Sequence, residues 1–261
     1  MAVEREGIQK DRVARSFLRG LKTYETEAVV QKRVNERLIE RIEGLGRPRY
    51  DRILEIGSGT GMFSRLLNER FRPSVFFVND LVPECFQIVL KKLDKNGPDQ
   101  IYPLFGDIEH LELPAKLDLV ASSSTFQWLD DLSRFYPKVR RALNNEALFA
   151  FSMFGGDTYY EIKELTGTGL DYPSFTQVLD QLSRDFQIIH AEVDRDQLHF
   201  DHPRDVLSHI RSTGVGGVGG FSWTPRRYER FIEEYIAGFS TEQGVMLSYV
   251  SYLVIGRKKG D

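Results

Sequence analysis

The chain has 261 residues, of which 41% are hydrophobic and 28% are charged, a balance typical of a globular protein with a large core. Its net charge of −3 gives no basic excess, so the composition does not point to nucleic acid as the main partner. The single cysteine, Cys85, excludes an internal disulfide bond and indicates a reducing compartment, so we expect a cytoplasmic protein.

Neither a membrane segment nor a metal site is expected. No apolar stretch reaches the roughly 18 residues that suggest a membrane helix. The charged N-terminus lacks the apolar core of a signal peptide. The five histidines show no metal-ligand spacing with cysteine.

The first part of the chain is expected to be helical. Residues 8–43 carry apolar side chains at helical spacing and should form two helices that break near Gly20. Tyr24 would then lie in a polar run between the two helices. Because this segment precedes the first strand, we expect residues 1–44 to fold over the functional site as a lid.

Residues 45–156 alternate between strand and helix patterns and are expected to form the core. The predicted strands are 52–56, 75–79, 101–105, 117–121 and 147–153. The predicted helices are 60–70, 82–95 and 130–143. This alternation indicates a parallel sheet with right-handed crossovers, in which ligands bind at the carboxyl ends of the strands.

The last third of the chain adds two strands and an insertion. Strands are predicted at 186–193, with an extension toward Phe200, and at 245–256. Between them, residues 201–243 should carry helices at 203–211 and 225–237 around a glycine-rich loop at 214–220, and would roof the site. We therefore expect one α/β domain with a doubly wound, mostly parallel, seven-stranded sheet and helical lid elements.

A glycine-rich turn follows the first predicted strand. Gly57, Gly59 and Gly61 alternate with Ser58 and Thr60 directly after that strand and before the next helix. Glycines at such a turn let the backbone approach a ligand closely, and the helix start presents free N–H groups. The alternative is a fortuitous glycine turn.

The nature of the ligand follows from the residue before this turn. Glu55 on the strand would repel a pyrophosphate but suits a cation. S-adenosylmethionine (SAM) carries a sulfonium and an ammonium group. The pattern resembles the first motif of class I SAM-dependent methyltransferases, whose sheet ends with an antiparallel strand.

Two aspartates follow the next two strands. Asp80 lies 19 residues after Gly61, at the distance expected for a carboxylate that accepts hydrogen bonds from ribose hydroxyls. By resemblance, Asp107 would meet the adenine amino group. Their neighbours Leu81 and Ile108 are expected in the same pocket. Each aspartate alone is also explained as a helix N-cap.

The loop after the fourth strand is expected beside the transferred methyl group. It contributes Ser123 to the predicted cofactor pocket. Phe126 and Trp128 have two open interpretations. They either bound the sulfonium through cation–π contacts or pack the sheet against the following helix.

Three segments together resemble one family, the malonyl-[acyl-carrier-protein] O-methyltransferases of biotin synthesis. They are residues 17–31, 124–131 and 203–215. This chain has Gly20 and Leu21 where the family usually has two alanines before the tyrosine, and Arg211 where a lysine is common. The first and third segments lie in the two predicted lid regions.

The resemblance implies methyl transfer from SAM to the free carboxylate of malonyl-acyl carrier protein or malonyl-CoA. A carboxylate is already ionised at neutral pH, so this reaction needs no general base. Tyr24, His209 and Arg211 are the candidates for holding the substrate carboxylate. Residues 209 and 211 do not share a helix face, so we expect only one of them to point inward.

Other interpretations stay open on the sequence alone. The core motifs fit a methyltransferase for another small acid or a quinone precursor equally well. A non-catalytic module of the same fold is a third possibility. An acidic carrier protein needs a basic patch, for which the sequence offers two clusters, Arg134 with Lys138 and Arg141, and Arg226 with Arg227 and Arg230.

Overall fold

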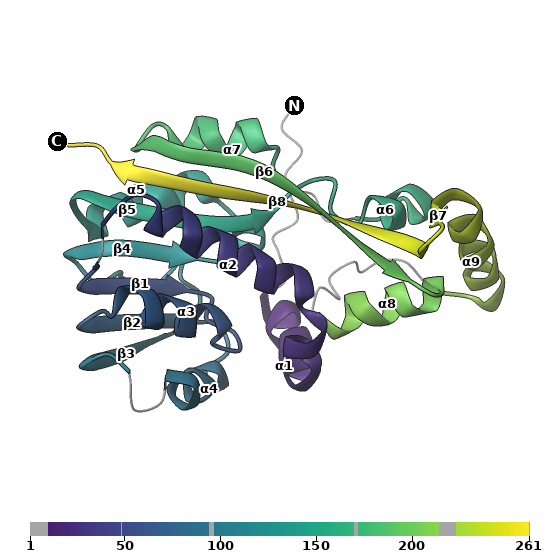
Figure 1. Cartoon of the computed structure of the whole chain (residues 1–261), viewed down its shortest axis with the longest axis horizontal. Helices are drawn as coiled ribbons and strands as arrows, with labels where there is room; N and C mark the ends of the chain where they lie inside the picture. Colours follow the sequence, from purple (N-terminus) through teal and green to yellow (C-terminus); the bar gives the residue numbers. More distant parts are fainter. Residues whose placement is uncertain (1–9, 48, 94–96, 170–171, 214–222, 261) are drawn as a thin grey trace.

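The computed structural model describes residues 10–47, 49–93, 97–169, 172–213 and 223–260. One sheet runs through the molecule, and helices cover both of its faces (Figure 1). The predicted glycine-rich loop at 214–220 lies outside the described residues.

The sheet has the strand order β3-β2-β1-β4-β5-β8-β6. Its parallel strands are β1 (Arg52–Ile56), β2 (Val75–Asp80), β3 (Gln100–Phe105), β4 (Leu117–Ser122) and β5 (Leu143–Phe154). The antiparallel part consists of β6 (Phe186–Phe200), β8 (Gly244–Lys258) and the short β7 (Ser240–Thr241). The doubly wound, mostly parallel sheet is confirmed, with the short β7 beside β8 as an eighth strand.

Nine α-helices are described. They are α1 (Lys10–Glu27), α2 (Val29–Glu43), α3 (Met62–Phe71), α4 (Glu84–Leu93), α5 (Leu132–Ala142), α6 (Tyr160–Thr166), α7 (Phe175–Leu182), α8 (Pro203–Ser212) and α9 (Pro225–Phe239). A short 3₁₀ helix, η2 (Phe126–Trp128), follows β4. No helix within the described ranges has the length and apolarity needed to cross a membrane.

The break in the N-terminal helical region was predicted at the wrong place. Gly20 lies inside α1 and is buried, and the chain breaks at Ala28 instead. Tyr24 is consequently a helical residue of α1. A buried glycine is tolerated in a helix where packing offsets its cost of about 1 kcal/mol. The last turn of α1 carries acidic residues and no basic one, which the helix dipole disfavours, and this favours an end near Glu27.

Apolar side chains fill three regions. On one face of the sheet, Tyr50, Leu38 and Ile42 are fully buried with residues of α3 and α4. The opposite face holds the aromatic cluster beneath α5 and α7. A third cluster lies around Tyr235 and Tyr249, where β6 and β8 extend beyond the parallel strands (Figure 1). Helices α6, α8 and α9 gather around this extension, and the cluster also includes Val30 and Val34 of α2, so the insertion packs against the N-terminal helices.

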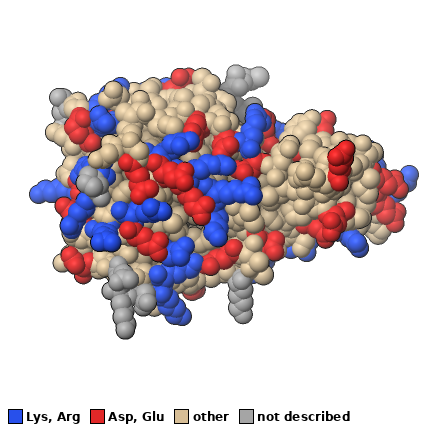
Figure 2. All heavy atoms as spheres, in the orientation of Figure 1, with Lys and Arg blue, Asp and Glu red and all other residues tan. Residues whose placement is uncertain are grey.

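Ion pairs join α2 to β6. Arg33 and Arg37 contact Asp196 at 3.1 and 3.4 Å, and Arg41 contacts Glu192 at 3.0 Å. Figure 2 shows blue and red side chains interleaved over this face. The positive charges of α2 are thus largely matched by carboxylates.

Candidate active site

A cavity of 170 Å³ lies at the carboxyl ends of β1, β2 and β4. One face of α1 covers it with Lys10, Val13, Phe17 and Tyr24, which follow each other at helical spacing. The parallel sheet predicts this edge as the ligand site, and the N-terminal helix closes over it. Helix α2 also borders the cavity, through Gln31 and Asn35, and the lid role of residues 1–44 stays a prediction.

The glycine turn forms the floor of the cavity. Gly57 has φ +75°, and a Cβ there would lie 2.0 Å from Thr125 Oγ1, so the position has no room for a side chain. Gly57, Ser58 and Gly59 all line the cavity. Gly61, predicted to bind the cofactor, faces α4 instead, where a Cβ would lie 3.2 Å from Val89 Cα. Gly61 thus serves the packing of α3 against α4.

Asp80 fixes the conformation of this turn. Its Oδ2 accepts a hydrogen bond of 2.7 Å from the Gly59 N–H, and its Oδ1 accepts one of 2.8 Å from the Val82 N–H. Burial raises the pKa of Asp80, although these two hydrogen bonds oppose the shift. The side chains of Cys85 and Ser58 lie beside the same carboxylate and also oppose the shift, so a ligand hydroxyl would share Asp80 with them. Leu81 lines the cavity beside it.

Glu55 lies fully buried on β1, directly before the glycine turn. Neither of its carboxylate oxygens has a partner at hydrogen-bond geometry among the described residues, although the nearby Ser64 hydroxyl opposes the rise in its pKa. Burial, with a smaller contribution from the negative charge of Asp80, raises the pKa of Glu55 to about 8. A buried, unpaired carboxylate is costly unless a ligand supplies a cation. Glu55 is not itself among the residues that line the cavity, whereas its neighbours Ile56 and Gly57 are, so an ammonium or sulfonium group of a ligand would meet this charge across the glycine turn.

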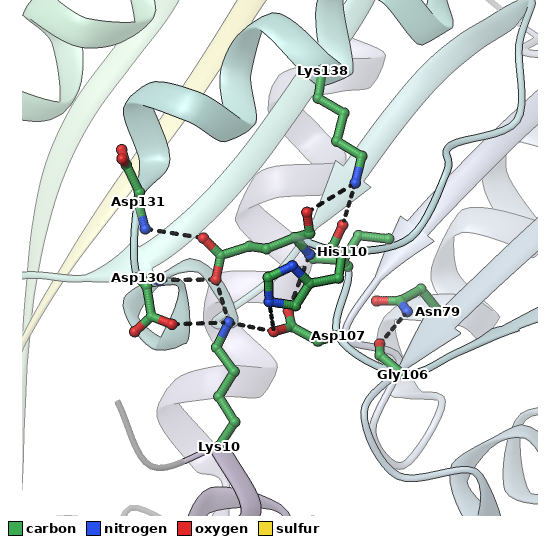
Figure 3. A network of polar contacts seen from close by, with 10 residues as sticks. Lys10, Asn79, Gly106, Asp107, His110, Asp130, Asp131 and Lys138 are labelled. Carbon is green, nitrogen blue, oxygen red and sulfur yellow. Dashed lines mark hydrogen bonds and ion pairs between the residues drawn. The ribbon is translucent and has the colours of Figure 1, made fainter. Parts of the chain in front are cut away.

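Asp107 belongs to a network of charged groups at the end of β3 (Figure 3). Its Oδ2 accepts a hydrogen bond of 2.7 Å from Lys10 Nζ, and its Oδ1 accepts one of 3.0 Å from the Glu109 N–H. Lys10 also pairs with Glu109, and with Asp130 at 3.4 Å. Partial burial would raise the pKa of Asp107, but the hydrogen bonds from Lys10 and Glu109 hold it below its ordinary value.

The same network ties three loops together. Glu109 accepts hydrogen bonds from the N–H groups of Asp130 and Asp131 at 2.9 and 3.0 Å. Lys138 donates to the carbonyl oxygens of Ile108 and Glu109 at 2.9 and 3.1 Å (Figure 3). Ile108 is thereby held against the cavity, which it lines. Lys138 points inward, so the predicted basic patch of α5 loses its central cation.

The loop after β4 separates its two aromatic residues. Phe126 is almost fully buried, and its ring lies 5.6 Å from Phe135 and 5.0 Å from Phe151. Phe126 was predicted to contact the cofactor, and the structure shows the packing alternative instead. Trp128 and Ser123 line the cavity. Phe126 occupies the position of η2 that faces the sheet, because burying its aromatic ring there stabilises the core.

The three candidates for the substrate carboxylate do not come together. Tyr24 lines the cavity, and burial raises the pKa of its hydroxyl, which stays a neutral donor. His209 is buried behind it, with Nε2 2.7 Å from Tyr249 Oη and Nδ1 3.4 Å from Glu27. Burial lowers the pKa of His209. Arg211 is exposed and lines a different cavity.

Sequence reasoning missed several residues of the cavity, and two of them, Gln31 and Lys10, carry polar groups that bear on the site. Gln31 is buried on α2 and lines the cavity, and its Oε1 has no partner among the residues described. A polar residue on the apolar face of a helix is the signal that reveals it. Lys10 carries no such signal, because its partners Asp107 and Glu109 lie almost 100 residues away in the chain.

A family of proteins described as "Methyltransferase domain" matches residues 53–146, which hold the glycine turn, Asp80 and Asp107.

Nearly full-length relatives also exist. The malonyl-[acyl-carrier protein] O-methyltransferase of Chlorobium phaeovibrioides is 38% identical over 95% of this chain and 96% of its own. The proteins of the same name from Prosthecochloris aestuarii and Bacteroides thetaiotaomicron are 35% and 33% identical. They cover 96% and 97% of this chain, and 94% and 99% of their own.

Solved structures share the fold at low sequence identity. The YcgJ protein of Bacillus subtilis is 14% identical with a TM-score of 0.61, covering 87% of this chain and 100% of its own. A phosphoethanolamine N-methyltransferase of Haemonchus contortus, solved with S-adenosyl-L-methionine, is 19% identical with a TM-score of 0.51. That pair covers 82% of this chain and 50% of the other.

Proposed function

This chain belongs to the malonyl-[acyl-carrier protein] O-methyltransferase family, and we propose that it methylates the free carboxylate of a malonyl unit on acyl carrier protein with SAM as donor. The observation that carries the cofactor part is the buried, unpaired carboxylate of Glu55 behind the glycine turn. We place this reaction in the cytoplasm, as an early step of biotin synthesis.

The residues around the cavity fit the parts of SAM. Glu55 supplies the negative charge for its amino group, and the glycine turn borders its amino-acid portion. The N–H groups of Gly57 and Ser58 donate to the Asn79 carbonyl oxygen and that of Gly59 to Asp80, so the turn is held in shape within the protein. We assign the ribose hydroxyls to Asp80, because its carboxylate lines the cavity beside the glycine turn. We assign Asp107 and Ile108, at the end of β3, to the adenine ring, because both line the cavity. Lys10 then closes this end of the cavity through Asp107 and Glu109.

For this reaction the protein has to orient the two substrates and exclude water, and little else. When bound, SAM supplies an electrophilic methyl group, which the carboxylate oxygen takes while the carbon–sulfur bond breaks and its electron pair stays on sulfur. No side chain has to accept a proton, because the substrate carboxylate is ionised at neutral pH. The chain has to orient this carboxylate and exclude water.

Tyr24 is our candidate for holding the substrate carboxylate. It faces the cavity from α1, and its neutral hydroxyl donates one hydrogen bond. His209 does not reach the cavity, because its ring contacts Tyr249 instead, so its effect on the substrate would be indirect. Tyr159 in turn donates to the Tyr249 hydroxyl at 3.1 Å. This buried polar chain keeps the wall behind Tyr24 rigid.

Methyl-labelled SAM with malonyl-acyl carrier protein tests the proposal directly. We expect the carrier to gain one base-labile methyl group, with free malonate as the comparison acceptor. Labelled malonate but unlabelled carrier would assign the enzyme to small acids instead. SAM binding without transfer to either would contradict the proposed substrate, and absence of SAM binding would indicate a non-catalytic module.

Tyr24→Phe tests the role of the hydroxyl. We expect kcat/KM for the malonyl substrate to fall roughly tenfold to a hundredfold, because the buried carboxylate loses a donor, while SAM affinity is kept. Tyr160→Phe, an exposed tyrosine at the start of α6, is the control. Equal activity of the two variants would remove Tyr24 from the substrate site.

A further inference from the structure

A second cavity, of 530 Å³, lies against a different face of α1. Helix α1 contributes Ser16, Arg19, Gly20 and Thr23, which lie three, four and seven positions apart and share one helix face. The remaining walls come from α6, from α8 and from Trp223. Its volume is within the range of about 300–1,000 Å³ typical of ligand sites. The reaction described above leaves this cavity without a role.

The two cavities share α1 as a common wall. Tyr24 lines the first cavity and its neighbour Thr23 lines the second. At the end of α8 the same relation holds, because Thr213 lines the first cavity and Ser212 the second. A molecule in the second cavity thus has to pass only the width of one helix, about 10 Å, to reach the cavity with the glycine turn.

The second cavity combines two cations with apolar walls. Arg19 and Arg211 line it from α1 and α8, and both side chains are exposed. Within the described part of the chain, neither has a carboxylate within ion-pair distance. Two arginines without acidic partners suit a phosphate group, which a guanidinium binds through two parallel hydrogen bonds.

The apolar walls indicate the rest of the ligand. Ile162, Leu207 and Ile210 line the cavity together with Trp223, whose ring packs edge-on against Phe231 at 5.1 Å. The hydroxyl groups of Ser16 and Thr23 add hydrogen-bonding capacity on the α1 side. A ligand with one phosphate and a long, uncharged, amide-containing chain matches this lining.

We propose that the second cavity receives the phosphopantetheine arm of acyl carrier protein, with Arg19 and Arg211 on its phosphodiester. The arm then leads past the end of α8 so that the malonyl group reaches Tyr24. This assignment rests on the proposed function, since it names how that substrate enters. It also moves Arg211 from the substrate carboxylate to the phosphate.

Charge complementarity favours this place over the other basic clusters. Lys138 of α5 donates to backbone carbonyl groups, and Arg230 of α9 pairs with Glu234 at 2.7 Å. The face shown in Figure 2 carries interleaved charges of both signs. In contrast, Arg12 and Arg15 are exposed on α1 two turns and one turn before Arg19, and they extend the positive surface at the second cavity for an acidic carrier.

Binding of carrier protein without any methyl transfer tests the site itself. The wild-type enzyme should bind holo-acyl carrier protein about tenfold more tightly than apo-acyl carrier protein, which lacks the arm. The double variant Arg19→Gln/Arg211→Gln should lose this preference. Arg65→Gln, an exposed arginine of α3 that lines neither cavity, should keep it. Equal binding of holo- and apo-carrier by the wild type would overturn the proposal.

Kinetics with a shortened substrate separate the phosphate from the carboxylate. For malonyl-acyl carrier protein, the double variant should show a KM raised about tenfold, with kcat and the KM for SAM kept. For malonyl-pantetheine, which lacks the phosphate, variant and wild type should be equal. A matching loss on malonyl-pantetheine would show that the arginines hold the malonyl carboxylate. A wild type inactive on malonyl-acyl carrier protein would contradict the proposed function, while the binding experiment still decides the role of the cavity.

Discussion

The unpaired carboxylate of Glu55 should make the folding stability of the SAM-free protein fall as pH rises. Its pKa changes from 4.5 in the unfolded chain to about 8 in the folded protein, chiefly because of burial. Between these two pKa values Glu55 is protonated in the folded protein and ionised in the unfolded chain, so raising the pH lowers the free energy of unfolding. The penalty is smallest below about pH 4.5 and complete above about pH 8.

The size of the effect follows from these two pKa values. Between about pH 5 and about pH 8.5, ionisation of Glu55 costs about 4 kcal/mol of unfolding free energy, at 1.36 kcal/mol per pKa unit. Glu55→Gln removes the titrating group and with it this pH dependence. For a chain of this length, 4 kcal/mol corresponds to a shift of roughly 10 °C in melting temperature.

Thermal unfolding of wild type and Glu55→Gln over this pH range is the assay. The difference in melting temperature should move in favour of the variant by roughly 10 °C from about pH 5 to about pH 8.5. A constant offset between the two proteins reflects the buried amide alone and does not enter this comparison. Glu69→Gln, an exposed carboxylate of α3, should show no such trend. Parallel curves for Glu55→Gln and wild type would refute the reasoning.

Three further predictions concern packing and closure. Phe126→Ala should cost about 3–5 kcal/mol of unfolding free energy in urea titration, yet leave SAM affinity within twofold after correction for folded protein. A selective loss of SAM affinity would restore the cofactor contact. Lys10→Met should speed trypsin cleavage within α1, because three carboxylates lose their shared cation, whereas Lys91→Met on α4 should not; equal rates would show that Lys10 does not hold the helix. Gly57→Ala should weaken SAM binding at least tenfold by calorimetry, because its Cβ meets Thr125, whereas Gly238→Ala has open space; unchanged affinity would mean that the loop yields.

The sequence predicted the sheet because its signals are local. Each parallel strand is a short apolar run, and each helix has its own apolar stripe, so periodicity places them within a few residues. The carboxyl ends of parallel strands meet at one edge, which brought Asp80 and Asp107 to the cavity that Gly57 lines. The short β7, with two residues, is too short for any such pattern.

Choices between packing and ligand contact were beyond the sequence. Phe126 and Trp128 lie two positions apart in one loop, yet one is buried in the core and the other lines the cavity. Likewise, Gly61 carries the same backbone signal as Gly57 but faces a helix rather than the cavity. Which side a residue faces depends on the elements packed against it.

The sequence by itself determined which residues suit SAM and in what order they occur along the chain. They are a glutamate at the end of a strand, a glycine turn and two later aspartates. Only the tertiary structure decided where α1 packs on the rest of the protein. The partners of Lys10 lie almost 100 residues away in the chain, and the sequence does not show which of its many carboxylates a lysine will contact. The same placement gives α1 two lined faces and separates Tyr24 from Arg211. Long-range packing, which no local pattern records, therefore set the boundary between cofactor and carrier sites.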